Sequence, residues 1–153
     1  MLKKHREVII VDQTGKALVK LLSPLRTEFH LKDVLQVIIG ASILAIPVGF
    51  TEESWKLAET LPLANVLGFV ALSILFISIF VYYNYHKEKI KETWEGYFKR
   101  TALTYVLSFI VVAIILTLIQ KTPWATDSLL ALKRVALVTF PASMSAAVAD
   151  TIH

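Results

Sequence analysis

Two adjacent carboxylates, Glu52 and Glu53, are the residues of this chain best placed to do chemistry. They follow a long apolar run that ends near Phe50, and Trp55 stands just after them. Because tryptophan favours the level of the lipid headgroups, we expect both glutamates at the outer mouth of a membrane-spanning helix. A carboxylate there attracts and partly dehydrates cations, and copies around a symmetry axis would form a ring. The alternative is a solvated acidic loop.

Two adjacent cations, Lys133 and Arg134, lie inside the last apolar segment of the chain. An unpaired cation at the centre of a bilayer costs at least ~2.5 kcal/mol, so these side chains are expected to find partners. Three interpretations stay open. The cations form an ion pair with Glu52 or Glu53, they extend to the outer surface, or they attract an anion.

The first and last apolar segments are rich in small residues, and each contains a proline. Ala41, Ala45 and Gly49 recur every four residues, a spacing that lets helices pack closely in lipid. Pro47 and Pro141 each remove a backbone hydrogen bond and predict a helix kink. Such interrupted helices are typical of binding sites in transporters. The residues predicted to line a pathway or to pair within it are Thr51, Lys133, Arg134, Ser143 and Ser145.

The sequence offers no constellation for catalysis, metal binding or a cofactor. It has no cysteine, and its four histidines are scattered without the spacing of a metal site or an acid-base pair. Glycine-rich phosphate loops and nucleophile elbows are also missing. We therefore expect neither an enzyme nor a cofactor-binding protein.

Four apolar segments must position these residues. They cover about residues 33–50, 61–85, 101–119 and 129–149 of a 153-residue chain that is 56% hydrophobic. Each is near the ~20 residues that a helix needs to cross a hydrocarbon core, and lipid leaves backbone amides no partner outside their own helix unless a barrel closes. The predicted fold class is an all-α membrane protein, with a four-transmembrane-helix bundle over residues 31–153.

Lysine and arginine concentrate before the first segment and between the second and third. Of the 16 basic residues, seven occupy the first stretch and five the second. A basic excess in alternate loops follows the positive-inside rule, so we expect a multi-pass protein of the plasma membrane with both termini cytoplasmic, and no nucleic-acid partner. The aromatic residues predicted to anchor the helices at the membrane surfaces are Trp55, Trp124, Tyr82 and Tyr83.

Two polar regions are expected on the cytoplasmic side. In residues 1–30, two aliphatic runs surround the turn signal Asp12-Gln13-Thr14-Gly15 and predict a short N-terminal cytoplasmic β-hairpin. In residues 86–100, Ile90 and three aromatic residues at helical spacing predict an amphipathic helix along the inner membrane surface.

Three stretches of the chain carry a further pattern. They read GASILAIP over 40–47, TEESW over 51–55 and ALVTFPASMSAA over 136–147. Over about residues 31–150 the chain resembles a prokaryotic family of integral membrane proteins catalogued as a domain of unknown function. Ser145 stands where that pattern has glycine. The resemblance implies a multi-span membrane protein and supplies no reaction, substrate or catalytic residue.

Together these features favour a cation-conducting channel or small-ion transporter with Glu52 or Glu53 as its outer carboxylate site. Four helices enclose little space, so we expect a homo-oligomer whose subunits form the pathway between them, with the lipid bilayer and small ions as further partners. The alternative is a non-transporting scaffold or sensor that binds a partner through its hairpin and amphipathic helix.

Overall fold

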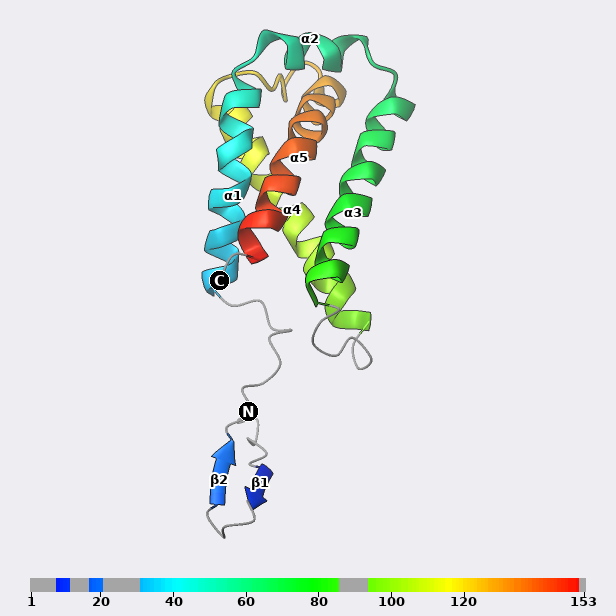
Figure 1. The fold of residues 1–153 in the computed structure, drawn as a ribbon. Helices are drawn as coiled ribbons and strands as arrows, with labels where there is room; N and C mark the ends of the chain where they lie inside the picture. Colours follow the sequence, from blue (N-terminus) through cyan, green and yellow to red (C-terminus); the bar gives the residue numbers. More distant parts are fainter. Residues whose placement is uncertain (1–7, 12–16, 21–30, 86–93, 152–153) are drawn as a thin grey trace.

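A computed structural model describes residues 8–11, 17–20, 31–85 and 94–151 of the chain (Figure 1). Within these residues the helices are α1 (Leu31–Gly49), α2 (Glu52–Thr60), α3 (Leu63–Tyr85), α4 (Trp94–Leu118) and α5 (Ser128–Thr151). All except α2 are long and apolar enough to cross a membrane. The predicted all-helical bundle with four spans is therefore confirmed.

The short helix α2 lies across one end of the bundle, where α1 ends and α3 begins (Figure 1). We call this the α2 end, and the opposite end, where α1 begins and α5 finishes, the Asp150 end. Thr51, in extended conformation, precedes the helix, and its Oγ1 donates to the carbonyl of Val48 at 2.7 Å. Leu61 ends the helix with ψ 133°, because the residue before Pro62 disfavours helical geometry.

The core of the bundle is formed by α1, α4 and α5, with α5 at the centre. Its buried hydrophobic residues are Val37, Ala41 and Ala45 of α1, Val112 and Leu116 of α4, and Val135, Val138, Ala142 and Ala146 of α5. A smaller cluster of Ile77 and Val81 with Ala147 joins α3 to α5. The face of α1 that carries its regularly spaced small residues is therefore buried within the bundle.

Residues 94–100 differ from the sequence prediction. They form the first two turns of α4, continuous with the span, instead of a separate helix on the membrane surface. Two contacts explain why the helix is already part of the bundle here. The Tyr97 hydroxyl donates to the carbonyl of Ser78 on α3, and Arg100 is buried. Residues 86–93 lie outside the described residues.

Two four-residue strands precede the helices. β1 (Val8–Val11) and β2 (Ala17–Lys20) are paired antiparallel, with Val8 opposite Lys20 (Figure 1). The turn at 12–16 and the segment at 21–30 are outside the described residues, and the cytoplasmic hairpin therefore stays a prediction.

Candidate functional site

A buried ion pair joins α4 to α5 at the Asp150 end. Arg100 donates from Nε and Nη2 to Oδ2 of Asp150, at 2.8 and 2.7 Å. The two side chains are only 5% and 2% exposed. Charged groups inside a membrane bundle are costly to desolvate, so they are tolerated where they pair with each other or serve an ion pathway.

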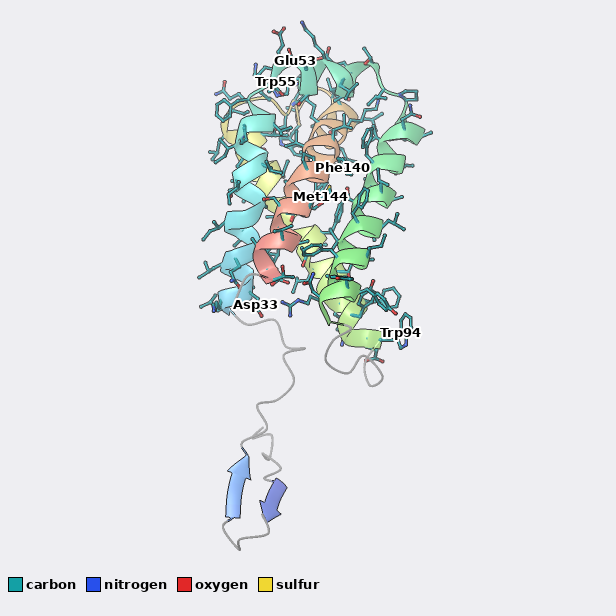
Figure 2. All side chains as sticks on the ribbon, viewed as in Figure 1. Asp33, Glu53, Trp55, Trp94, Phe140 and Met144 are labelled. Atoms are coloured by element: carbon teal, nitrogen blue, oxygen red, sulfur yellow. The ribbon has the colours of Figure 1, made fainter. Side chains whose placement is uncertain are left out.

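A third charged side chain, Asp33, is buried at the same end. It belongs to the first turn of α1 and is 8% exposed. Figure 2 shows it at the Asp150 end, opposite Glu53 and Trp55. The buried charged residues described at this end are thus two carboxylates and one guanidinium.

The buried face of α4 is polar near this ion pair and apolar beyond it. From the Asp150 end it carries Arg100, Thr101, Thr104 and Ser108, and then Val112 and Leu116. The hydroxyl of Ser108 donates to the carbonyl of Thr104 at 2.7 Å, whereas those of Thr101 and Thr104 have no hydrogen-bond partner among the described residues. A polar stripe thus leads from the ion pair towards the aliphatic core.

None of these charged residues was selected from the sequence. By the hydropathy pattern Arg100 falls in the basic segment before the third span and Asp33 at the start of the first, while Asp150 lies 50 residues from its partner. One signal was available: residues of opposite charge stand at the predicted ends of two spans on the same side of the membrane. Which helices are neighbours could not be read from the sequence.

The structure gives Lys133 and Arg134 partners at the α2 end. Lys133 Nζ donates to the carbonyl of Leu61 at 2.9 Å, and Arg134 Nη1 to that of Lys121 at 2.6 Å. Arg134 also pairs with the carboxylate of Glu59. The carbonyls follow the last turns of α2 and α4, where the helix dipole favours a cation. Of the three open interpretations, an ion pair is thus present for Arg134, but with a third glutamate of α2.

The two glutamates expected at a pathway lie exposed on the first turn of α2. Glu52 pairs with Lys56 at 2.8 Å, and both side chains are about two-thirds exposed. An ion pair this open to solvent contributes little to stability. Thr51, the residue before α2, shares a 2.7 Å hydrogen bond between its hydroxyl and that of Ser54 in the first turn of the helix.

The predicted anchors lie at both ends of the bundle. At the α2 end, Trp55 Nε1 donates to the carbonyl of Gly49 and Trp124 Nε1 to Thr117 Oγ1, both at 2.9 Å. Tyr82 and Tyr83 are exposed near the end of α3. Their position agrees with an aromatic belt, and their anchoring role stays a prediction.

A family model described as "Putative integral membrane protein (DUF2391)" matches residues 11–152. The chain belongs to this family. No curated protein and no solved structure matches the chain. The match confirms the resemblance drawn from the sequence and extends over the buried ion pair and all four spans.

In this DUF2391 chain the first and last spans, α1 and α5, pack so closely at Gly40 that there is no room for a side chain. A Cβ built on Gly40 would lie 2.5 Å from Cβ of Ala149 and 2.9 Å from both Cα of Ala146 and the carbonyl oxygen of Ser145. Ser143 is fully buried and donates to the carbonyl of Phe140 at 3.0 Å. The serines expected along a pathway therefore lie on a helix that is pressed against α1.

The two prolines interrupt neither helix of this family member. Pro47 lies in the last turn of α1, and Pro141 lies well inside α5. The helices continue past both residues, and the kinks predicted there stay predictions.

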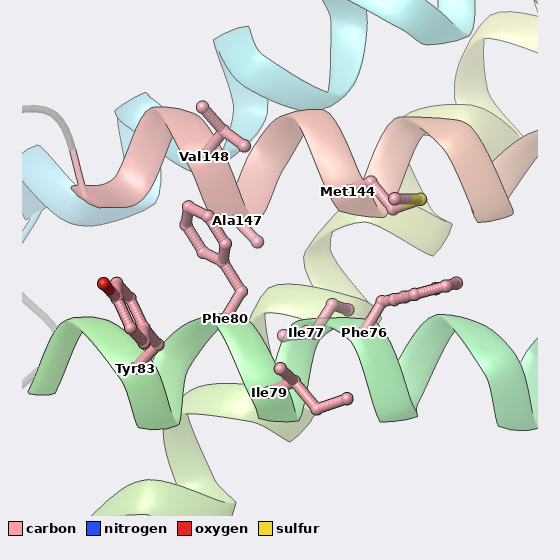
Figure 3. A pocket seen from close by; sticks show the side chains of 8 residues that line it. All are labelled: Phe76, Ile77, Ile79, Phe80, Tyr83, Met144, Ala147 and Val148. Carbon is pink, nitrogen blue, oxygen red and sulfur yellow. The ribbon is translucent and has the colours of Figure 1, made fainter. Parts of the chain in front are cut away.

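A separate hollow of about 270 Å³ opens between α3 and α5 (Figure 3). Its walls carry almost no polar atoms, and in a bilayer such a surface accepts hydrocarbon. The lining residues are Phe76, Ile77, Ile79, Phe80, Tyr83, Met144, Ala147 and Val148. The hollow does not suit ion chemistry, and the candidate functional site is the charged cluster at the Asp150 end.

Proposed function

We propose that the chain is a transporter of small cations whose substrate binds at the Asp150 end. One observation supports the proposal above all others: Asp33, Arg100 and Asp150 are charged side chains buried in a bundle of four apolar spans. Ionisable residues within spans are expensive and mark the routes of ions and protons. Two of the three are carboxylates, and carboxylate oxygens are ligands for cations.

The packing of the core favours a transporter over an open channel. Between the charged cluster and the α2 end, the buried residues include Ala41, Ala45, Val112 and Leu116, each 0% exposed. A channel needs a continuous water-filled pathway, whereas a closely packed aliphatic core excludes water. Substrate would therefore enter from the Asp150 end and leave after a rearrangement of the helices.

We further infer the orientation from the basic residues. The Asp150 end would face the cytoplasm of a plasma-membrane protein, because residues 1–30 and 86–100, rich in lysine and arginine, are linked in sequence to the start of α1 and the end of α3, which lie there. Glu52 and Glu53 would then face outside and raise the local concentration of cations without binding them within the bundle. A homo-oligomer, with apolar helix faces meeting between copies, stays part of the proposal. A catalytic role does not.

The proposal is tested by flux through vesicles that contain the purified full-length chain. Asp33→Asn keeps the shape of the side chain and removes one charge, so it should lower cation flux by at least ~10-fold, equivalent to about 1.4 kcal/mol in the barrier. The double variant Glu52→Gln/Glu53→Gln is the control, and it should lower flux only at low ionic strength, where surface charge is poorly screened.

Asp33 is chosen over Asp150 because loss of the Asp150 carboxylate removes the ion-pair partner of Arg100. Unchanged flux in a folded Asp33→Asn protein would contradict the proposed site. Flux abolished by the Glu52→Gln/Glu53→Gln variant at all ionic strengths would return the site to the outer carboxylates. Vesicles with no flux, together with a partner retained through residues 1–30, would favour the scaffold or sensor.

A further inference from the structure

The helix α2 covers the end of the bundle at which α5 begins. It lies across that end, between the end of α1 and the start of α3, and it contacts α5 (Figure 1). The first part of α5 is closely packed, since Ala131 and Val135 are both 0% exposed. A cation that leaves the bundle at this end must therefore pass α2.

The attachment of α2 to the bundle is mainly polar. Of its nine residues only Ala58 is buried, whereas α1, α4 and α5 each bury several aliphatic side chains. Segments with few buried apolar contacts open at a low cost in free energy, and the lids of transporters and enzymes are drawn from such segments. The helix α2 can therefore separate from the bundle more easily than any of the four spans.

Two bonds fasten the C-terminal half of α2 to α5. The carboxylate of Glu59 pairs with Arg134, and Lys133 Nζ donates to the carbonyl of Leu61 at 2.9 Å. The Glu59 side chain is 51% exposed, so water and salt reach the ion pair from outside. Such a pair exchanges readily for hydration. The two cations of α5 thus hold α2 with contacts that can break and form again.

The N-terminal half of α2 is held to other helices. Trp55 Nε1 donates to the carbonyl of Gly49, and Lys121 Nζ lies 4.1 Å from the centroid of the Trp55 ring. Thr51 and Leu61, the residues that flank α2, have extended backbones with ψ 133°. Residues at the ends of helices can serve as hinges. The bonds to α5 can therefore break while Trp55 keeps α2 attached to the end of α1.

We propose that α2 is the outer gate of the transport path and that Lys133 and Arg134 hold it closed. This rests on the proposed function and deepens it, because it names the element that controls release of the cation. It also gives a role to two cations that the last span carries at a cost. Release of substrate requires both bonds to α5 to break.

The first test fixes α2 to α5 by a chemical crosslink. The chain has no cysteine, so Glu59→Cys/Arg134→Cys can be joined specifically by a short bis-methanethiosulfonate and separated again by reductant. Crosslinking should lower cation flux through vesicles at least ~10-fold, because every cation must pass the gate, and reductant should restore it.

The matched control carries its crosslink within α2. Lys56→Cys/Thr60→Cys places two exposed thiols one helical turn apart, so the reagent joins them without tying α2 to another helix. Flux should be the same before and after this reaction. Full flux through a completely crosslinked Glu59→Cys/Arg134→Cys protein, or an equal loss in the control, would overturn the gate.

The second test measures opening without transport. Ala58→Cys places a thiol where the side chain is 0% exposed, and a maleimide reaches it only when α2 lifts. The labelling rate, divided by that of the same thiol in the unfolded chain, should rise about 2- to 5-fold on adding Glu59→Gln, since solvent already weakens the pair. Adding Lys56→Gln instead breaks an ion pair within α2 and should leave the rate unchanged.

The two tests separate the gate from the transport that it would control. A rate that Glu59→Gln does not raise would show that the pair with Arg134 does not hold α2, and the proposal would be wrong. Faster labelling with silent vesicles would keep the movement of α2 but reject transport and, with it, the role of a gate. Flux that falls in Asp33→Asn but withstands the crosslink would keep transport and reject the gate.

Discussion

A single methyl group at Gly40 should separate the first and last spans. In Gly40→Ala the new Cβ would lie 2.5 Å from Cβ of Ala149, and 2.9 Å from both Cα of Ala146 and the carbonyl oxygen of Ser145. Two of these three atoms belong to the backbone of α5, so no side-chain rotation relieves the contact. The helices must move apart.

The size of the effect follows from two opposing terms. Extra volume in a packed core costs about 1–3 kcal/mol. Replacing glycine by alanine inside a helix returns at most ~1 kcal/mol through its better helix propensity. We therefore expect the free energy of unfolding to fall by about 1–2 kcal/mol, which lowers Tm by about 2 to 8 °C for a domain of this size.

The measurement is thermal unfolding in detergent of three single variants. Gly68→Ala of α3 is the matched control, because a Cβ there meets nothing within 4 Å, and its Tm should be unchanged or higher. Gly49→Ala should fall between the two, since its Cβ would meet only the flexible end of Leu116, at 3.3 Å. If Gly40→Ala were as stable as Gly68→Ala, the close packing of α1 on α5 would be refuted.

Three further predictions concern charges. Asp150→Asn leaves Arg100 without its carboxylate and should lower the free energy of unfolding by about 3 kcal/mol, whereas replacing both residues by leucine should cost less; equal losses in detergent unfolding would contradict this. Glu59→Arg should lower Tm slightly, and adding Arg134→Glu should cost less than the sum of the two single losses, because the swapped pair still joins α2 to α5 although the bond from Arg134 to the carbonyl of Lys121 is lost; an additive loss would exclude the pairing. Since the chain has no cysteine, Glu53→Cys should react with an impermeant maleimide from outside intact cells, and labelling only after lysis would reverse the orientation.

The four spans were predictable to within a few residues, except for the start of α4. The solvent imposes their form, because backbone amides in hydrocarbon are satisfied only within a helix. Trp94 begins α4 earlier than the apolar pattern does, since Tyr97 and Arg100 find polar partners on α3 and α5. A hydropathy profile identifies residues that favour lipid, and it cannot identify polar residues that join a span because they bond to neighbouring helices.

The helix α2 and the partner of Arg134 could not be predicted. Nine residues with few apolar side chains give a weak helical signal, and tertiary contacts at Trp55 and Glu59 hold α2 in place. As a helix, α2 presents Glu59 to α5 and leaves Glu52 and Glu53 on its exposed side. The sequence identified the two carboxylates nearest the end of the first span, but the choice among three glutamates depends on where α2 crosses the bundle.

The composition of α5 bears on how the protein enters the bilayer during synthesis. Of the four spans, α5 has the lowest mean hydropathy and is the most enclosed. Half of its apolar stretch is buried inside the bundle, against a third or less in the other spans. A helix that carries Lys133, Arg134 and Asp150 partitions poorly into lipid by itself. Its insertion therefore depends on the three helices that emerge from the ribosome before it, and a nascent chain arrested ahead of Ser128 would expose Gly40 and Arg100, which contact α5 in the complete bundle.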